Sequence, residues 1–267
     1  MSAPSVTIDY RDSIAIITLN KPQKLNSLTK DEFYELATLL RAADARPEII
    51  VTVLIGKGRF FSAGADVSQN RNPAPGMTRF RHGLRETVAN NLNLAHAFST
   101  HSKVLVTALN GPVVGMTAAL VAYSDFIFAA PKTYLLTPFS SLGLVAEGGA
   151  SATFVRRMGP ARAAEALYLS KRIGVEALTQ CGFVNKQFEC NGDDFEKAVL
   201  QEVEGWVDGH LNGDSIIKIK KLLGAGGNSL LSEHVVQELF SGLERQVAGI
   251  PQKEFEKLKR GEKKHKL

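Results

Sequence analysis

The sequence predicts a single α/β domain followed by a helical extension. Apolar runs of strand length alternate with helical patterns as far as about residue 136, whereas the segments after Ala150 have helical spacing only. A chain of 267 residues, 44% of them hydrophobic, can supply a sizeable core. We therefore expect a core over residues 1–200 and a C-terminal helical region with a basic tail over residues 201–267.

The N-terminal part predicts a hairpin, a helix and a buried strand. Val6–Tyr10 and Ile14–Leu19 have strand composition and are separated by a short turn. Thr29 and Glu32 have the spacing of a capping box, which starts a helix by satisfying free backbone donors. Ile49–Ile55 is almost wholly apolar, as is typical of a strand that is buried on both faces.

The middle of the chain mixes a loop, helices and strands. Residues 68–78 are polar with two prolines and a glycine, so we expect an exposed loop there, and a helix from Arg79 to His101. Met116–Tyr123 predicts a short helix. The expected strands here are Val104–Leu109, Asp125–Ala129 and Thr133–Leu136.

Helices dominate the last part of the chain. Gly159-Pro160 is expected to separate the first two of them, because glycine and proline both interrupt helical backbone. The expected helices are 150–158, 160–169, 174–181, 193–208, 214–223, 231–247 and 252–259.

Composition argues against several functional classes. Cys181 and Cys190 have neither metal-ligand spacing nor a disulfide framework, which fits a reducing compartment. No apolar run is long enough to span a bilayer, and the N-terminus has no secretory pattern. Residues 251–267 hold seven Lys/Arg and three Glu, so most of the net charge of +5 belongs to this tail. We therefore expect neither nucleic acid nor a metal or nicotinamide cofactor.

Two glycine-containing turns, FFSAGAD (60–66) and LNGPVVGM (109–116), are the most informative features of the chain. Each follows or closes an apolar strand-like run. Glycine there allows backbone N–H groups to turn out of a sheet toward one point, and two converging N–H donors suit an oxyanion. Glu147, in LGLVAEGG (142–149), is a carboxylate that could serve as a base.

Together with NKPQKLNSL (20–28), these motifs occur in the order and spacing of the crotonase (enoyl-CoA hydratase/isomerase) superfamily, which the first two-thirds of the chain resembles. The resemblance implies a spiral of ββα turns and C-terminal helices that pack in a homotrimer or hexamer. It also implies an acyl-CoA thioester as substrate and no further cofactor, because CoA is part of that substrate.

By resemblance, the N–H groups of Ala65 and Met116 are the oxyanion donors. Ala63, Gly64 and Gly115 complete the two turns and are expected to lie against the substrate. The alternative for each turn taken alone is that its glycines only allow the chain to reverse.

Side chains around the turns distinguish the possible reactions. Hydratases of this family place one glutamate three residues after the second oxyanion donor and another after a proline, where this chain has Ala119 and Phe139. Water addition is therefore disfavoured, and Phe139 is expected to contact substrate instead.

One acid remains. Isomerases of the fungal type in this family have a catalytic glutamate at the position of Glu147, where apolar neighbours would raise its pKa. The alternative is an acid that only stabilises a helix N-terminus. Asn91 could orient this carboxylate, but Asn90 and Asn93 are close enough to leave the assignment open.

The resemblance places CoA across the first turn and the NKPQKLNSL loop. Lys24 and Leu25 are the expected contacts, through an ammonium that faces a phosphate and through backbone. Asp66 lies at this site too, where it is expected to tie its own turn together.

These observations favour a Δ3-Δ2-enoyl-CoA isomerase of fatty-acid β-oxidation. A dienoyl-CoA isomerase on the same fold, and a non-catalytic binding or RNA-associated scaffold, are the alternatives. His265-Lys266-Leu267 resembles a peroxisomal address of the Ser-Lys-Leu type, which predicts the peroxisomal matrix and an import receptor as partner.

Overall fold

The computed structural model describes residues 4–68, 73–224 and 228–263. Within this part of the chain, six strands form the main sheet in the order β1-β2-β3-β4-β6-β9. The β1–β2 pair is antiparallel and all the other pairs are parallel. The bounds are Val6–Arg11 (β1), Ile14–Leu19 (β2), Val51–Gly56 (β3), Val104–Leu109 (β4), Phe126–Ala129 (β6) and Lys186–Gln187 (β9).

The central strands are buried on both faces, as the apolar run at 49–55 predicted. In β3, Val53 and Ile55 belong to one hydrophobic cluster and Leu54, which lies between them, belongs to the other. This alternation follows from the two-residue period of a strand. Helices must therefore cover both faces of the sheet.

The larger cluster lies mainly between the sheet and four helices, with Leu178 of α6 (Val175–Gln180) added, whereas α7 (Gly192–Val207) covers the opposite face with Phe195, Val199 and Val203. The capping box of α1 is confirmed: the Glu32 N–H donates to Thr29 Oγ1 at 3.2 Å and the Thr29 N–H donates to Glu32 Oε2 at 2.7 Å. The four helices are α1 (Lys30–Asp44), α3 (Ala89–Ser99), α4 (Met116–Val121) and α5 (Ala150–Leu169).

A second sheet of three short strands was only partly predicted. Its order is β5-β7-β8, and only β7 (Tyr134–Leu136) was expected. Strands of two residues have no period for a sequence pattern to reveal, which explains why β5 (Val113–Val114), β8 (Ile173–Gly174) and β9 were missed.

The single helix expected from Arg79 to His101 is interrupted by a change of helix type. It consists of α2 (Arg79–Gly83), a π-helical turn over Leu84–Val88, and α3. In contrast, the expected break at Gly159-Pro160 is confirmed, because Gly159 has non-helical dihedrals (φ 74°, ψ 163°) inside α5.

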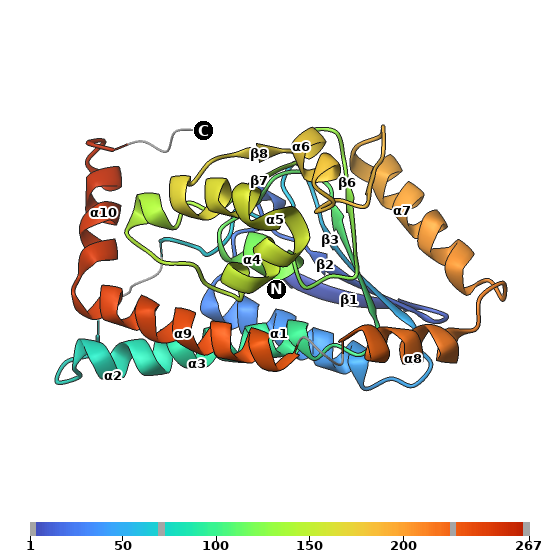
Figure 1. The fold of residues 1–267 in the computed structure, drawn as a ribbon, viewed down its shortest axis with the longest axis horizontal. Helices are drawn as coiled ribbons and strands as arrows, with labels where there is room; N and C mark the ends of the chain where they lie inside the picture. Colours follow the sequence, from blue (N-terminus) through green and yellow to red (C-terminus); the bar gives the residue numbers. More distant parts are fainter. Residues whose placement is uncertain (1–3, 69–72, 225–227, 264–267) are drawn as a thin grey trace.

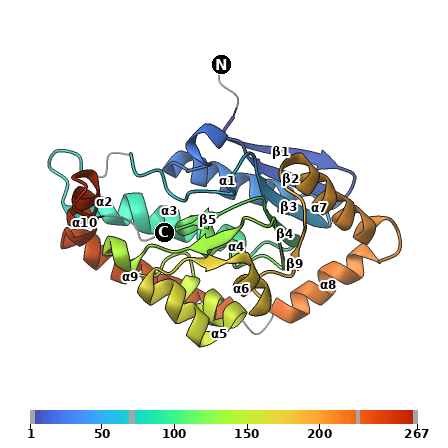
Figure 2. The ribbon, with the colours of Figure 1, turned by 90° about the horizontal axis from the view of Figure 1, so that it is seen from above.

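Three further helices follow α7, and the expected boundary at residue 200 falls within α7. Figure 1 shows α9 lying along α2 and α3, and Figure 2 shows α8 and α10 at opposite ends of the molecule. In the described ranges no helix is long and apolar enough to cross a membrane. The bounds are Gly213–Gly224 (α8), Asn228–Val247 (α9) and Ile250–Lys259 (α10); α6 spans Val175–Gln180, and two 3₁₀ turns span Pro22–Lys24 (η1) and Ser140–Leu142 (η3).

Candidate active site

The two glycine-containing turns leave the same edge of the sheet. β3 and β4 are parallel neighbours, so the segments that follow their carboxyl ends start side by side. They remain paired beyond the strands: Ser62 and Val113 form a parallel bridge, and the Val114 N–H donates to the Ser62 carbonyl at 2.9 Å.

The turns approach each other so closely that residue 64 must be glycine. Gly64 has φ +86°, and a β-carbon there would lie 2.7 Å from the carbonyl oxygen of Val114. Gly115 has φ +64°, and a β-carbon on it would lie 4.0 Å from the α-carbon of Gly64. Ala65 and Met116, the residues that follow these glycines, are therefore brought to one place.

The N–H groups of Ala65 and Met116 are left available by the surrounding hydrogen bonds. The Leu28 N–H donates to the Gly64 carbonyl at 2.9 Å, and the Asp66 N–H donates to the Leu28 carbonyl at 2.8 Å. The Ala65 N–H takes no part in this pairing. Met116 is the first residue of α4, where an N–H has no partner within its helix. Among the described residues neither N–H has an acceptor. Two such donors suit an enolate oxygen, and the N-terminus of α4 adds partial positive charge.

Glu147 lies in the segment between η3 and α5, packed against the first turn of α4. Its neighbour Gly148 has φ +67°, and a β-carbon there would lie 2.9 Å from Met116 Sδ and 3.1 Å from Ala119 Cβ. The structure thus brings the carboxylate-bearing segment to the same helix N-terminus as the second N–H donor.

The three asparagines of α3 have different hydrogen-bond partners. Asn91 Nδ2 donates to Glu147 Oε2 at 3.4 Å, whereas Asn90 Nδ2 donates to the Glu86 carbonyl at 3.0 Å. Asn93 accepts from the Arg41 guanidinium at 2.7 Å. The π-helical turn just before α3 changes the helical phase, which decides which of the three side chains faces Glu147.

The positions of the hydratase glutamates lie in the core. Ala119 is 0% exposed and Phe139 is 2% exposed, both in the hydrophobic cluster that contains Met116. Neither side chain can hold or activate a water molecule. The two positions at which hydratases of this family carry glutamates are thus buried and apolar in this chain.

The NKPQKLNSL loop is tied to the first turn. The Ala63 N–H donates to the Leu25 carbonyl at 2.8 Å, and Lys24 Nζ lies 3.9 Å from Asp66 Oδ2. Asp66 accepts from both the N–H and the hydroxyl of Ser68, and these bonds lower the pKa of its carboxyl. Asp66 thus ties its own turn, as predicted. Lys24 is largely exposed and accessible to an anionic group.

Sequence reasoning missed one acid beside this site. Glu238, on α9, is buried and accepts hydrogen bonds from the N–H groups of Gly149 and Ser151 at 2.7 and 2.8 Å. Burial raises the pKa of its carboxyl. Its spacing from the apolar Val235 and Leu239 was the available signal, since it places a carboxylate on an inward face of the helix.

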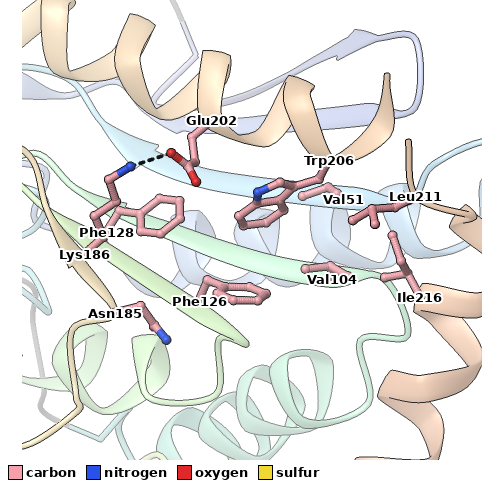
Figure 3. A pocket seen from close by; sticks show the side chains of 10 residues that line it. All are labelled: Val51, Val104, Phe126, Phe128, Asn185, Lys186, Glu202, Trp206, Leu211 and Ile216. Atoms are coloured by element: carbon pink, nitrogen blue, oxygen red, sulfur yellow. Dashed lines mark hydrogen bonds and ion pairs between the residues drawn. The ribbon is translucent and has the colours of Figure 1, made fainter. Parts of the chain in front are cut away.

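An apolar cavity of about 490 Å³ lies elsewhere, between the sheet and α7 and α8 (Figure 3). Val51 and Val104, which line it, begin β3 and β4, whereas the glycine-containing turns follow the other ends of these strands. The Lys186–Glu202 ion pair, at 2.6 Å, lies at its polar side. This cavity is therefore separate from the site around Glu147.

Neither cysteine forms a disulfide: Cys181 and Cys190 are free thiols. In the ranges that the structure describes, no group of three or more His, Cys, Asp or Glu side chains could hold a metal ion.

The fold and site define a member of the enoyl-CoA hydratase/isomerase family, and the model of that family matches residues 9–227. The chain belongs to this family, which implies an acyl-CoA thioester as substrate. A Delta(3,5)-Delta(2,4)-dienoyl-CoA isomerase of Pyricularia oryzae is 48% identical over 98% of each chain. A 3,2-trans-enoyl-CoA isomerase of Saccharomyces cerevisiae is 34% identical over 94% of this chain and 93% of that one.

Solved structures confirm the fold. An enoyl-CoA hydratase/isomerase from Pseudoalteromonas atlantica has a TM-score of 0.84 at 20% identity and covers 99% of this chain and 100% of that one. At that identity the likeness concerns the α/β crotonase fold alone. The predicted fold class is therefore confirmed.

Proposed function

We propose that this protein is a double-bond isomerase of enoyl-CoA thioesters and that its preferred substrate is a 3,5-dienoyl-CoA, converted to the 2,4-dienoyl-CoA. The observation that carries the reaction class is the packing of the segment that holds Glu147 on Met116 through Gly148, next to positions where a hydratase needs acids and this chain has Ala119 and Phe139. The dienoyl substrate is supported by the Pyricularia oryzae relative at 48% identity.

In this mechanism Glu147 takes a proton from C2 of the thioester. The electrons move to the thioester oxygen, which the Ala65 and Met116 N–H groups stabilise as an extended enolate. Glu147, now protonated, returns the proton to the far end of the conjugated system. Asn91 holds the carboxylate through its 3.4 Å hydrogen bond. One proton leaves and one is returned, so no co-reactant is needed.

A 3-enoyl-CoA is the second candidate, and the single acid favours it. Its proton returns at C4, two bonds from C2, which one carboxylate can reach without moving. In a 3,5-dienoyl-CoA the proton returns at C6, so the acyl chain must curve around Glu147 for one carboxylate to serve both carbons. The Saccharomyces cerevisiae relative at 34% identity supports this second candidate.

Purified protein offered each substrate in turn tests the proposal. The 2,4-dienoyl and 2-enoyl thioesters absorb at different wavelengths, so both reactions can be followed directly. We expect kcat/KM to be at least tenfold higher for the 3,5-dienoyl-CoA, and both activities to be lost in Glu147→Gln. A higher kcat/KM for the 3-enoyl-CoA than for the 3,5-dienoyl-CoA would support the second candidate. Hydration of 2-enoyl-CoA at a rate comparable with isomerisation would contradict the reaction class.

The peroxisomal location and the homotrimer or hexamer stay predictions. His265-Lys266-Leu267 lies outside the described residues, and one mouse relative bears the name "Enoyl-CoA delta isomerase 3, peroxisomal". A fluorescent fusion that keeps the C-terminus free, compared with one that lacks the last three residues, tests the address. Analytical ultracentrifugation tests the assembly.

A further inference from the structure

One face of α9 lies along the segment that carries Glu147. His234, Glu238, Gly242 and Arg245 are spaced by four, four and three residues, so they share one side of the helix. His234, Glu238 and Arg245 hydrogen-bond to residues between 143 and 151, Gly242 faces Val145, and the order of these pairs is antiparallel to the helix. We call this set the α9 clamp.

The C-terminal half of the clamp holds the segment before Glu147. Arg245 Nε donates to the Gly143 carbonyl at 2.9 Å. A β-carbon on Gly242 would lie 3.8 Å from Val145 Cγ2, which is ordinary van der Waals contact. The backbone on this side of Glu147 is thus held to α9 by one hydrogen bond, where Gly242 leaves room for Val145.

The N-terminal half holds the segment after Glu147, through Glu238. Both carboxylate oxygens of Glu238 accept backbone N–H groups, of Gly149 at 2.7 Å and of Ser151 at 2.8 Å, while His234 Nδ1 lies 3.0 Å from Ser151 Oγ. These N–H groups belong to the N-terminal turn of α5, where a carboxylate is electrostatically favoured. Gly149 has φ +82°, a conformation that glycine adopts readily and that leads the chain into α5.

The neighbouring part of the same buried face of α9 packs on the helix that carries Asn91. Val235 and Leu239 are buried against Ala95, one helical turn beyond Asn91 on α3. Because α9 contacts both elements, it sets the position of α3 relative to the segment of Glu147. The 3.4 Å hydrogen bond between Asn91 and Glu147 joins side chains from these two elements.

We propose that Glu238 is a positioning residue: its carboxylate anchors the backbone just after Glu147 to α9 and so keeps Glu147 aligned with Asn91 and the Met116 N–H. This inference rests on the proposed function, in which Glu147 is the base. Loss of the anchor should slow proton transfer and leave acyl-CoA binding nearly unchanged, since Lys24 and Leu25 lie on another part of the chain.

The test compares Glu238→Gln and Glu238→Ala with Glu244→Gln, a matched control because Glu244 is an exposed acid on the same helix. Glutamine keeps one acceptor and alanine keeps none. We expect kcat to fall about 10-fold in Glu238→Gln and about 100-fold in Glu238→Ala, as for one and two charge-assisted hydrogen bonds. KM should stay within about threefold, and the control should match the wild type.

Hydrogen exchange of the amides over residues 147–151 provides a readout that does not depend on activity. We expect exchange there to be faster in both Glu238 variants and unchanged in the control. Unchanged kcat in a folded Glu238→Ala, or a fall in kcat only in proportion to lost thermal stability, would overturn the inference. If the alanine variant does not fold, the nearly isosteric glutamine variant decides.

Failure of the proposed function has a different signature. A wild-type protein that isomerises neither substrate would remove Glu147 as a base, and the exchange experiment would still test the clamp by itself. Faster exchange in Glu238→Gln would then support the anchoring of this segment, and unchanged exchange would exclude it.

Discussion

Gly64→Ala should damage the oxyanion site by a steric effect that the geometry specifies. A β-carbon at residue 64 would lie 2.7 Å from the Val114 carbonyl oxygen, while ordinary contact begins at 3.4 Å. Relief of this overlap requires the two turns to separate by 0.7 Å, the difference between these two values. Because Val114 precedes Gly115 and Met116, the displacement falls on the second N–H donor.

The expected loss follows from the donor distance. An oxyanion donor acts at about 2.7–3.1 Å, so a shift of this size takes one N–H out of range. Loss of one donor costs about 10²–10³ in rate, or about 2.7–4 kcal/mol of transition-state stabilisation. The alanine also has to adopt φ +86°, which costs about 1–2 kcal/mol of folding stability.

Gly76→Ala separates the two effects. Gly76 has φ +78°, but nothing lies within 4 Å of a β-carbon there, so this variant carries the backbone strain without the overlap. We expect Gly64→Ala to lose more thermal stability than Gly76→Ala, because it adds the overlap to the strain, and only Gly64→Ala to lose about 10²–10³ in kcat/KM, measured by the absorbance of the conjugated product. If Gly64→Ala keeps kcat/KM within threefold of wild type, the two turns do not form the oxyanion site.

Three further changes have defined outcomes. Glu147→Gln should lower kcat by about 10³ or more at saturating substrate, because the amide cannot accept the proton, and a residual rate above a tenth of wild type would assign the base elsewhere. Asn91→Ala should lower kcat only about 3- to 10-fold, since its 3.4 Å bond to Glu147 is long, and a loss as large as that of Glu147→Gln would give Asn91 a direct part in proton transfer. Burial lowers the pKa of His101 from 6.5 to about 4, so the folded state holds this ring neutral and loses stability as the pH falls from about 6.5 to 4. His101→Asn should remove about 3 kcal/mol of that pH dependence in urea unfolding, and an unchanged dependence would show that other groups cause it.

Much of the fold can be predicted from short sequence patterns of a few adjacent residues. The capping box of Thr29 and Glu32, the apolar run of β3 and the break at Gly159 each depend on a few adjacent residues, and each was predicted. The two-residue strands and the π-helical turn were not predicted. A π-helical turn needs one additional residue in an otherwise helical pattern, and the apolar positions on either side still have helical spacing.

The candidate site was predicted where glycine fixes the backbone and left open where side chains meet. Gly64 and Gly115 meet a dihedral angle or a close approach that favours glycine, so their motifs are recognisable in the chain, and the family resemblance then assigned the N–H donors to the residues after them. Asn91 could not be separated from Asn90 and Asn93, because all three lie on one turn of helix. Only the phase set by the preceding π-helical turn, and the position of Glu147 in space, distinguishes them.

Glu238 shows the limit of local reasoning most clearly. Glu147 lies within a glycine-containing motif and was therefore noticed. Glu238 was missed because it lies 89 residues beyond Gly149, whose N–H it accepts. Helical spacing predicts that α9 has an inward face, but it cannot tell which loop that face will meet. A buried carboxylate is stable only where hydrogen-bond donors replace its lost hydration. Here the donors are the N–H groups of Gly149 and Ser151 at the N-terminus of α5, which have no acceptor within the helix. α9 therefore supports the proposed active site in this chain, because Glu238 accepts the N–H groups at the first turn of the helix that follows the proposed base.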